Sequence, residues 1–240
     1  QIQRQKTIAF CPYSSYNTTI PKAIKRHKKD TNMNKFLLLL QKNPHRLLQA
    51  LLNKIFKIKI NNTKACITNA EIETLQKYAG QTKFGIVEIG VLDGGTTREM
   101  ALVTKSPIYG IDPLIPDSMA HDLQGNEELI KKNLQFYKQF YFFKDYSYNL
   151  IKNWDKKFDF IFIDGDHRYE SVKQDFSDWS KKLELGGYTA FHDSAPVTSK
   201  PTNTHRGYDG PIKLVEELKN NPDLEYIETV DSITIFKKIK

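Results

Sequence analysis

The feature that most constrains this chain is a regular alternation of apolar runs and helical patterns, which begins at residue 68. The runs at 84–90 and 158–164 are almost continuously apolar. A strand with this pattern is covered on both faces, as strands in a parallel sheet are. Segments with the 3.6-residue spacing of helices separate the runs, and this order of elements predicts an α/β fold with a doubly wound sheet.

Capping and turn signals set the boundaries of these elements. Thr68 and Glu71 have the spacing of a capping box, and Gly80 takes the place of a C′ glycine at the end of the same helix. Asp231 and Ser232 join the last two strands as an antiparallel hairpin. We therefore expect helices at 68–80, 95–104, 125–138, 146–153, 168–183 and 211–220, and strands at 84–90, 107–112, 140–144, 158–164, 187–192, 224–230 and 233–238.

The first 69 residues differ in charge from the rest of the chain. They hold 14 Lys and Arg against one acid, whereas residues 70–240 hold 22 Lys and Arg against 27 acids. A basic segment of this kind binds nucleic acid, acidic lipid headgroups or acidic glycans, or is a solvated arm. We expect a flexible basic leader at 1–35, an amphipathic basic helical arm at 36–67 and the α/β domain at 68–240.

Within the arm, residues 44–58 have the clearest helical pattern. Asn43 is a suitable N-cap and Pro44 a suitable first helical residue, and the apolar residues that follow share one face. Such a helix packs on the core, pairs with a second subunit or lies on a membrane surface. We expect core or subunit packing ahead of membrane contact, and a homo-oligomer.

Cysteine content and hydropathy limit the cellular compartments that the sequence is consistent with. The two cysteines, Cys11 and Cys66, are too few for a disulfide framework or a four-cysteine zinc site. The longest apolar run, at 36–40, is too short to span a bilayer, and no secretory cleavage site follows it. We therefore expect a cytoplasmic protein with reduced cysteines.

Ligands of doubly wound sheets lie beyond the carboxyl ends of the strands, so the residues at these ends are the first candidates for a site. The first strand runs into Gly90, Gly94 and Gly95, which allow a ligand to approach the backbone closely. Their spacing is not GxGxxG, which argues against a dinucleotide. Glu88 would repel a pyrophosphate and suits a cationic or zwitterionic cofactor better.

The second and third strands each end in an acid. Asp112 lies 22 residues past Gly90, where its carboxylate can accept hydrogen bonds from both hydroxyls of a ribose. Charge-assisted bonds of that kind contribute about 1.5–3 kcal/mol each. Asp145, after the third strand, is a candidate partner for an adenine amino group.

The fourth and fifth strands end in a denser group of acids and histidines. Asp164 and His167 follow the fourth strand, and His192 and Asp193 follow the fifth. Because neighbouring strands lie about 4.8 Å apart, Asp164, His192 and Asp193 converge if the two strands are adjacent. They would then offer two oxygens and one nitrogen to a single divalent ion, with positions left open for water and substrate.

Two stretches of the chain resemble a known family. Residues 87–96 (VEIGVLDGGT) look like the first motif of the class I S-adenosylmethionine-dependent methyltransferases. Residues 163–172 (IDGDHRYESV), with the later 185–187 and 192–193, are similar to the subgroup of macrocin-type sugar O-methyltransferases and cephalosporin hydroxylase-like proteins. The resemblance covers 68–240 and implies a Rossmann-like seven-stranded sheet with an antiparallel last strand.

The same resemblance implies roles for individual residues. It makes His167 the catalytic base and Asp164, His192 and Asp193 the ligands of a divalent cation, Mg²⁺ or Mn²⁺. The subgroup carries an acid where His192 stands, and a nitrogen ligand suits Mg²⁺ less than Mn²⁺, Fe²⁺ or Zn²⁺. The residues expected to contact S-adenosylmethionine are Glu88, Gly90, Asp93, Gly94, Gly95, Thr96, Asp112, Asp145 and Asp164.

These expectations combine into one function, O-methyl transfer to a hydroxyl of a small molecule or of a sugar or glycan. The loop at 194–210 would overhang the acceptor, with His205, Arg206 and Tyr208 as candidate substrate contacts. The alternatives are an RNA or protein methyltransferase that grips its substrate with the basic arm, a nicotinamide-dependent oxidoreductase, and a non-catalytic binding module. The missing GxGxxG turn disfavours the oxidoreductase, and the acidic balance of 70–240 disfavours RNA.

Overall fold

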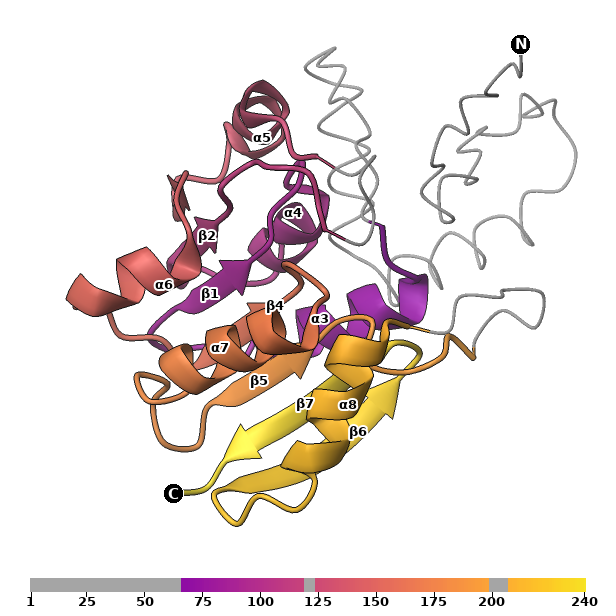
Figure 1. The fold of residues 1–240 in the computed structure, drawn as a ribbon. Coiled ribbons are helices and arrows are strands. Elements are labelled where there is room, and N and C mark those ends of the chain that lie inside the picture. The colour runs from indigo at the N-terminus through magenta and orange to yellow at the C-terminus, as the bar shows by residue number, and fades with distance from the viewer. Residues whose placement is uncertain (1–65, 119–123, 199–206) are drawn as a thin grey trace, which may run out of the picture. The chain divides into compact units, whose positions relative to one another are not determined.

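The computed structural model of the protein describes residues 66–118, 124–198 and 207–240 (Figure 1). The expected leader at 1–35, the helix at 44–58 and nearly all of the arm at 36–67 lie outside the described residues. The α/β domain expected at 68–240 is therefore the part of the chain on which the structure bears.

The domain is built on one sheet of seven strands in the order β3-β2-β1-β4-β5-β7-β6. The first five strands pair in parallel, and β7 runs antiparallel to both of its neighbours, β5 and β6. This confirms the doubly wound sheet with a reversed last strand. The strands are β1 (Ile86–Ile89), β2 (Ile108–Ile111), β3 (Phe140–Phe143), β4 (Phe160–Ile163), β5 (Tyr188–Phe191), β6 (Leu224–Val230) and β7 (Ile233–Lys238).

Helices cover both faces of the sheet (Figure 1). Helices α3 and α4 pack on one face, and α7 and α8 pack on the other. The strands β1 and β4 lie side by side at the point where the strand order reverses, which is where doubly wound sheets open a crevice for a ligand. The helices are α3 (Asn69–Ala79), α4 (Gly95–Ala101), α5 (Glu127–Leu134), α6 (Ser147–Leu150), the 3₁₀ turn η1 (Ile151–Asn153), α7 (Tyr169–Trp179) and α8 (Asp209–Leu218).

The alternation of side chains along β1 divides the core into two clusters. Val87 and Ile89 belong to the cluster under α7 and α8, whereas Ile86 belongs to the cluster under α3 and α4. Trp179 at the end of α7 is fully buried, and its ring meets the ring of Trp154 edge-on at 4.8 Å between centroids. Burial of a large aromatic side chain stabilises the fold by about 1.5–3 kcal/mol.

Most element boundaries lie within a few residues of the expected ones. The capping box of Thr68 and Glu71 is present, with both reciprocal hydrogen bonds formed. Gly80 differs from the prediction: it is the C-cap itself, in the right-handed region at φ −68°, rather than a C′ glycine. The helix expected at 125–138 is shorter, because the chain turns after Leu134 before it enters β3.

Two observations concern the expectations about membrane spans and about the redox state of the cysteines. Among the described helices, none has the length and apolar character that crossing a membrane requires. Cys66 is disulfide-bonded, which differs from the reduced cysteines expected from the cysteine count.

Candidate active site at the carboxyl ends of the strands

A cavity of about 500 Å³ lies at the carboxyl ends of the central strands. Ile89 and Ile111, the last residues of β1 and β2, line it, and Asp164 and His192 line it directly after β4 and β5. Four parallel strands thus deliver their terminal residues to one space, as the doubly wound topology predicts.

The glycine turn after β1 forms one wall of this cavity. Gly90 has φ +90°, and a Cβ added to it would lie 2.0 Å from the backbone oxygen of Asp164. Only glycine therefore lets the end of β1 approach the end of β4 this closely. Gly94 caps α4 at φ +76° and packs against Leu134 instead of lining the cavity. The predicted cofactor residues of this turn that line the cavity are Gly90, Asp93, Gly95 and Thr96.

Glu88 does not line the cavity, although the sequence placed it among the cofactor contacts. Side chains alternate along a strand, so Glu88 faces α4 together with Ile86, and it accepts a hydrogen bond of 2.5 Å from the hydroxyl of Thr97. Burial raises the pKa of Glu88 well above its usual range, and the nearby charges of Asp164 and Asp112 raise it further. Burial thus favours the neutral form of the carboxyl, and Glu88 does not line the cavity, so repulsion of a pyrophosphate by Glu88 does not explain the choice of cofactor.

Asp112 lies where the ribose-binding acid was expected, on the cavity wall after β2. Its carboxylate accepts backbone hydrogen bonds from Val91 at 2.8 Å, from Leu92 at 2.9 Å and from Leu114 at 2.7 Å. Leu92 and Leu114 have φ values of 53° and 58°, in the left-handed region that costs a residue with a Cβ about 1–2 kcal/mol. Asp112 thus also holds two strained turns in place beside the cavity.

Asp145 lies outside the cavity lining, which differs from its expected place beside an adenine. It accepts hydrogen bonds from the side chain of Asn149 at 3.0 Å and from the backbone of Tyr146 at 2.7 Å, and these bonds lower its pKa. The next residues, Tyr146 and Ser147, line the cavity instead. Asp145 therefore stabilises the turn that leads into α6, and the two residues after it form part of the cavity wall.

Sequence reasoning missed Asp175, a carboxylate of α7 that lines the cavity and is only 8% exposed. It accepts a short hydrogen bond from the hydroxyl of Ser147. Burial raises the pKa of Asp175 to about 6, although the bond from Ser147 opposes the shift. A signal for it exists in the sequence, because residue 175 falls at helical spacing among the apolar residues Val172, Phe176 and Trp179 that α7 buries.

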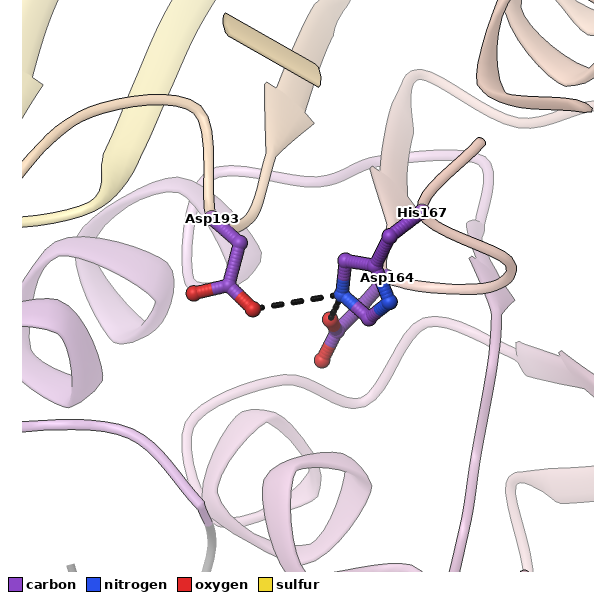
Figure 2. Close-up of side chains that lie close together, drawn as sticks. All are labelled: Asp164, His167 and Asp193. Carbon is purple, nitrogen blue, oxygen red and sulfur yellow. Dashed lines mark ion pairs between the residues drawn. The ribbon is translucent and has the colours of Figure 1, made fainter. Parts of the chain in front are cut away.

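The acids and histidines expected after β4 and β5 do converge. The two strands are neighbours, with Ile163 paired to Phe191, so the residues that follow each strand meet. Figure 2 shows Asp164, His167 and Asp193 directed toward one another, with candidate ligand atoms all within 4.8 Å of one another. His167 Nε2 lies 3.2 Å from Asp193 Oδ2 and 3.9 Å from Asp164 Oδ1, and His192 Nδ1 lies 2.8 Å from the same Asp164 oxygen.

Two further residues fix the imidazole of His167. Asp117, in the loop between β2 and α5, lies 3.1 Å from its Nδ1, and the ring of Tyr208 lies 4.2 Å from the imidazole between centroids. The backbone N–H of Tyr208 donates to the carbonyl of Asp193, whose φ of 51° is left-handed. Tyr208 therefore lines the cavity as expected, whereas the other candidate substrate contacts, His205 and Arg206, lie outside the described residues.

The surrounding carboxylates keep both histidines positively charged at neutral pH. Burial alone would lower the pKa of His167, but hydrogen bonds to Asp117 and Asp193 and the charge of Asp164 outweigh burial and raise it to about 9. Burial likewise opposes protonation of His192, while Asp164 and Asp193 raise its pKa to about 10. The protonated imidazoles balance the negative charge that a bound metal ion would otherwise balance.

The donor set fits a divalent cation. Asp164 and Asp193 supply carboxylate oxygens from adjacent strand ends, and both imidazoles bring nitrogen atoms within 4.0 Å of these carboxylates. Mixed oxygen and nitrogen donors of this kind suit Mn²⁺ or Fe²⁺ as well as Mg²⁺. The predicted ligand His192 is thus in contact with both acids, and the structure adds His167 as a second nitrogen at the same place.

Comparison with known proteins identifies the domain that carries this site. Residues 87–194 match the family described as a methyltransferase domain, and this range holds the glycine turn and the acid–histidine cluster. The uncharacterized protein R132 of Acanthamoeba polyphaga mimivirus is 34% identical over 132 residues. That match covers 51% of this chain and 57% of the viral protein, so the chain spans little more than half of this relative.

Solved methyltransferases share the fold at low sequence identity. The O-methyltransferase NovP is similar with a TM-score of 0.58 at 18% identity, over 75% of this chain and 84% of NovP. The O-methyltransferase TomG of Streptomyces achromogenes, solved with S-adenosylmethionine, gives a TM-score of 0.52 at 15% identity, over 78% of this chain and 86% of TomG. Residues 87–194 thus match the family described as a methyltransferase domain, and the described part of the chain shares its fold with solved O-methyltransferases.

Proposed function

We propose that the protein transfers the methyl group of S-adenosylmethionine to a hydroxyl oxygen of a small molecule or sugar, with the help of a divalent cation. The observation that carries this proposal is that a single cavity holds both the glycine turn with Asp112 and the cluster of Asp164, His167 and Asp193. A donor held by the first group and an acceptor held by the second would meet in the same space. The solved O-methyltransferases NovP and TomG have the same fold, which is consistent with this chemistry.

The cofactor half of the proposal rests on the shape and charge of the cavity wall. Gly90 and Gly95 expose backbone, and Asp112 faces the cavity with a carboxylate that already accepts three backbone hydrogen bonds. Each carboxylate oxygen has two lone pairs, so Oδ1, which accepts one backbone bond, can accept one further bond from a ribose hydroxyl. Asp93 and Asp164 add negative charge to the wall, which favours a sulfonium with its positive charge.

The acceptor half of the proposal rests on the acid–histidine cluster. Asp164 and Asp193 would hold the cation, with His192 as the nitrogen ligand. A cation bound there would lower the pKa of the acceptor hydroxyl and fix its oxygen in place. An acceptor with neighbouring hydroxyls, such as a sugar, suits such a site because two of its oxygens can be held together.

His167 would act as the base once a cation, in place of the imidazole proton, balances the charge of Asp164 and Asp193 and leaves Nε2 unprotonated. Its Nδ1 faces Asp117 at 3.1 Å, and its Nε2 faces the space between Asp164 and Asp193. Nε2 would take the hydroxyl proton, and bound S-adenosylmethionine would supply the methyl group to the oxygen and leave as S-adenosylhomocysteine. Asp117 stabilises the imidazolium that results, and alignment of oxygen, carbon and sulfur supplies several kcal/mol of the rate enhancement.

The proposal is tested by binding and transfer measured on the same preparation. We expect S-adenosylmethionine to bind in calorimetry, and the labelled methyl group to move to a polyhydroxylated acceptor from a panel of sugars and catechols. EDTA should stop transfer and Mn²⁺ or Mg²⁺ should restore it. His167→Gln should lose transfer while it keeps cofactor binding.

Three results would contradict parts of the proposal. Absence of cofactor binding would remove the assignment of the cavity. Transfer that EDTA leaves unchanged would remove the cation, and transfer by His167→Gln at the wild-type rate would remove the base. His27→Gln, a histidine outside the described residues, serves as the matched control for substitution of an imidazole by an amide.

A further inference from the structure

We infer that Glu71 is a positioning residue for His192: its carboxylate accepts the hydrogen on Nε2 of the imidazole, so that Nδ1 is the nitrogen presented to Asp164 and to a bound cation. This inference rests on the proposed function, which makes His192 a ligand of that cation. It goes beyond the proposed function because Glu71 belongs to α3, a helix outside the strand ends, and does not line the cavity.

The two ring nitrogens of His192 have different surroundings. Nδ1 faces the acid–histidine cluster, at 2.8 Å from Asp164 Oδ1 and 3.6 Å from Asp193 Oδ2. Nε2 is buried and has no hydrogen-bond partner among the residues that the structure describes. A buried N–H group without an acceptor costs about 1–3 kcal/mol, so an acceptor close to Nε2 is favoured.

A carboxylate oxygen lies close to Nε2. Glu71 Oε2 is 4.0 Å away, and neither side chain is more than 6% exposed. The ring of Phe162, which meets the imidazole edge-on at 6.1 Å between centroids, offers no acceptor. The separation of 4.0 Å is about 1 Å longer than an N–H···O hydrogen bond, so a small shift of the imidazole completes the bond. A cation that replaces the contact between Nδ1 and Asp164 leaves the imidazole free to make this shift.

Three donors from two parts of the chain fix the carboxylate of Glu71. Oε2 accepts from the backbone of Thr68 at 2.6 Å, as the capping box requires. Oε1 accepts from the backbone of Ser232 at 2.8 Å and from its hydroxyl at 2.6 Å. Each carboxylate oxygen has two lone pairs, so Oε2 can also accept from Nε2. The fold thus places an oriented carboxylate behind the ligand histidine, and carboxylates in this position contribute about 10- to 100-fold to metal affinity.

The alternative is that Glu71 only ties α3 to the turn between β6 and β7. Loss of stability after mutation would not separate the two cases, because both predict it. Asp231 offers a matched comparison, since it is a buried carboxylate at the same junction. It accepts hydrogen bonds from the hydroxyl of Thr68 at 2.7 Å and from the backbone of Thr198 at 3.0 Å. A structural role predicts similar effects of the two carboxylates on the cation site, whereas a positioning role predicts an effect of Glu71 alone.

The first experiment measures Mn²⁺ affinity of the full chain by electron paramagnetic resonance at pH 7.5, with urea unfolding as the check on folding. Glu71→Gln should weaken Mn²⁺ binding about 10-fold, and Asp231→Asn should bind as the wild type does. His192→Asn should also weaken binding. Glu71→Gln added to His192→Asn should then have no further effect, because a residue that acts through His192 has nothing left to position.

The second experiment does not depend on the folding of Glu71→Gln. Zn²⁺ is diamagnetic, so ¹⁵N NMR of the wild type with Zn²⁺ bound shows which nitrogen of His192 keeps its hydrogen. We expect the hydrogen on Nε2 and the metal on Nδ1. The loss of this resonance in His192→Asn assigns it.

Each outcome bears on a different claim. If the wild type binds neither Mn²⁺ nor Zn²⁺, the cation of the proposed function fails, and the inference fails with it. The inference fails while the cation site stands if the hydrogen lies on Nδ1, or if Glu71→Gln binds Mn²⁺ as the wild type does. Equal weakening by Glu71→Gln with and without His192, or equal weakening by Asp231→Asn, would reduce Glu71 to a structural residue.

Discussion

The close approach of β1 and β4 at Gly90 gives a prediction whose size can be worked out from the structure. Gly90→Ala places a methyl group 2.0 Å from the carbonyl oxygen of Asp164, at a φ of +90°. The backbone conformation alone costs about 1–2 kcal/mol for a residue with a Cβ. The contact is more than 1 Å too short, and the methyl group meets a backbone oxygen that cannot rotate away, so the ends of β1 and β4 must separate.

A matched control separates the cost of the left-handed backbone from the cost of the steric contact. Gly186 has φ +81°, and a Cβ added to it meets nothing within 4 Å. Gly186→Ala should therefore reduce the free energy of unfolding by about 1–2 kcal/mol through the backbone conformation alone. Gly90→Ala should reduce it by about 4 kcal/mol or more, the range of severe steric defects in a packed core.

Urea unfolding monitored by the tryptophan fluorescence of Trp154 and Trp179 measures both values. Calorimetry with S-adenosylhomocysteine provides the second readout, because separation of the strand ends moves the glycine turn away from Asp164. Gly186→Ala should bind the cofactor product as the wild type does, and Gly90→Ala should not bind it. Equal losses of unfolding free energy in the two variants would refute the close approach on which the reasoning depends.

Two further predictions concern the carboxylates of the cavity wall. Burial gives Asp175 a pKa of about 6 in the folded protein against about 3.9 in the unfolded chain, so the folded state holds the extra proton between these values. Unfolding free energy should therefore fall by up to about 3 kcal/mol as the pH rises from 4 to 7, relative to Asp175→Asn, and a pH-independent difference in urea unfolding would contradict this. Asp112→Ala removes the acceptor of three backbone N–H groups and should cost about 3–5 kcal/mol of unfolding free energy as well as cofactor binding. Asp112→Asn, which keeps one acceptor oxygen, should lose less stability in the same urea titration, and a variant Asp112→Ala as stable as the wild type would rule out the anchoring role.

The order of elements could be predicted because each central strand is a short apolar run between helical patterns. The convergence of Asp164 with Asp193 followed from the same topology, since adjacent parallel strands end at the same edge. Both predictions depend only on periodicity and on the rules of strand connection. They do not require any knowledge of how side chains pack.

Some local details were also within reach of sequence reasoning. Glu88 and Ile89 are neighbours on β1 and therefore face opposite sides of the sheet. Strand periodicity alone thus predicts that Glu88 points away from the cavity that Ile89 lines. Asp175 occupies a buried position on the helical wheel of α7, which is an unusual place for a carboxylate.

Other contacts depend on the path of a loop and could not be predicted. Asp117 reaches His167 from a segment without periodicity, fifty positions earlier in the chain. Asp145 lies outside the cavity because its carboxylate accepts hydrogen bonds from the side chain of Asn149 and the backbone of Tyr146. The sequence does not show that these local bonds are formed in place of a contact to a ligand.

The left-handed backbone conformation of Asp193 restricts which residues can replace it. At a φ of 51°, glycine, asparagine, aspartate and histidine are the residues that the chain tolerates at low cost. A glutamate introduced there would cost about 1–2 kcal/mol of backbone strain, whatever its affinity for a cation. Substitutions at this position are thus restricted to short polar side chains or an imidazole, and a longer carboxylate ligand would be introduced at lower cost at residue 192 or 167.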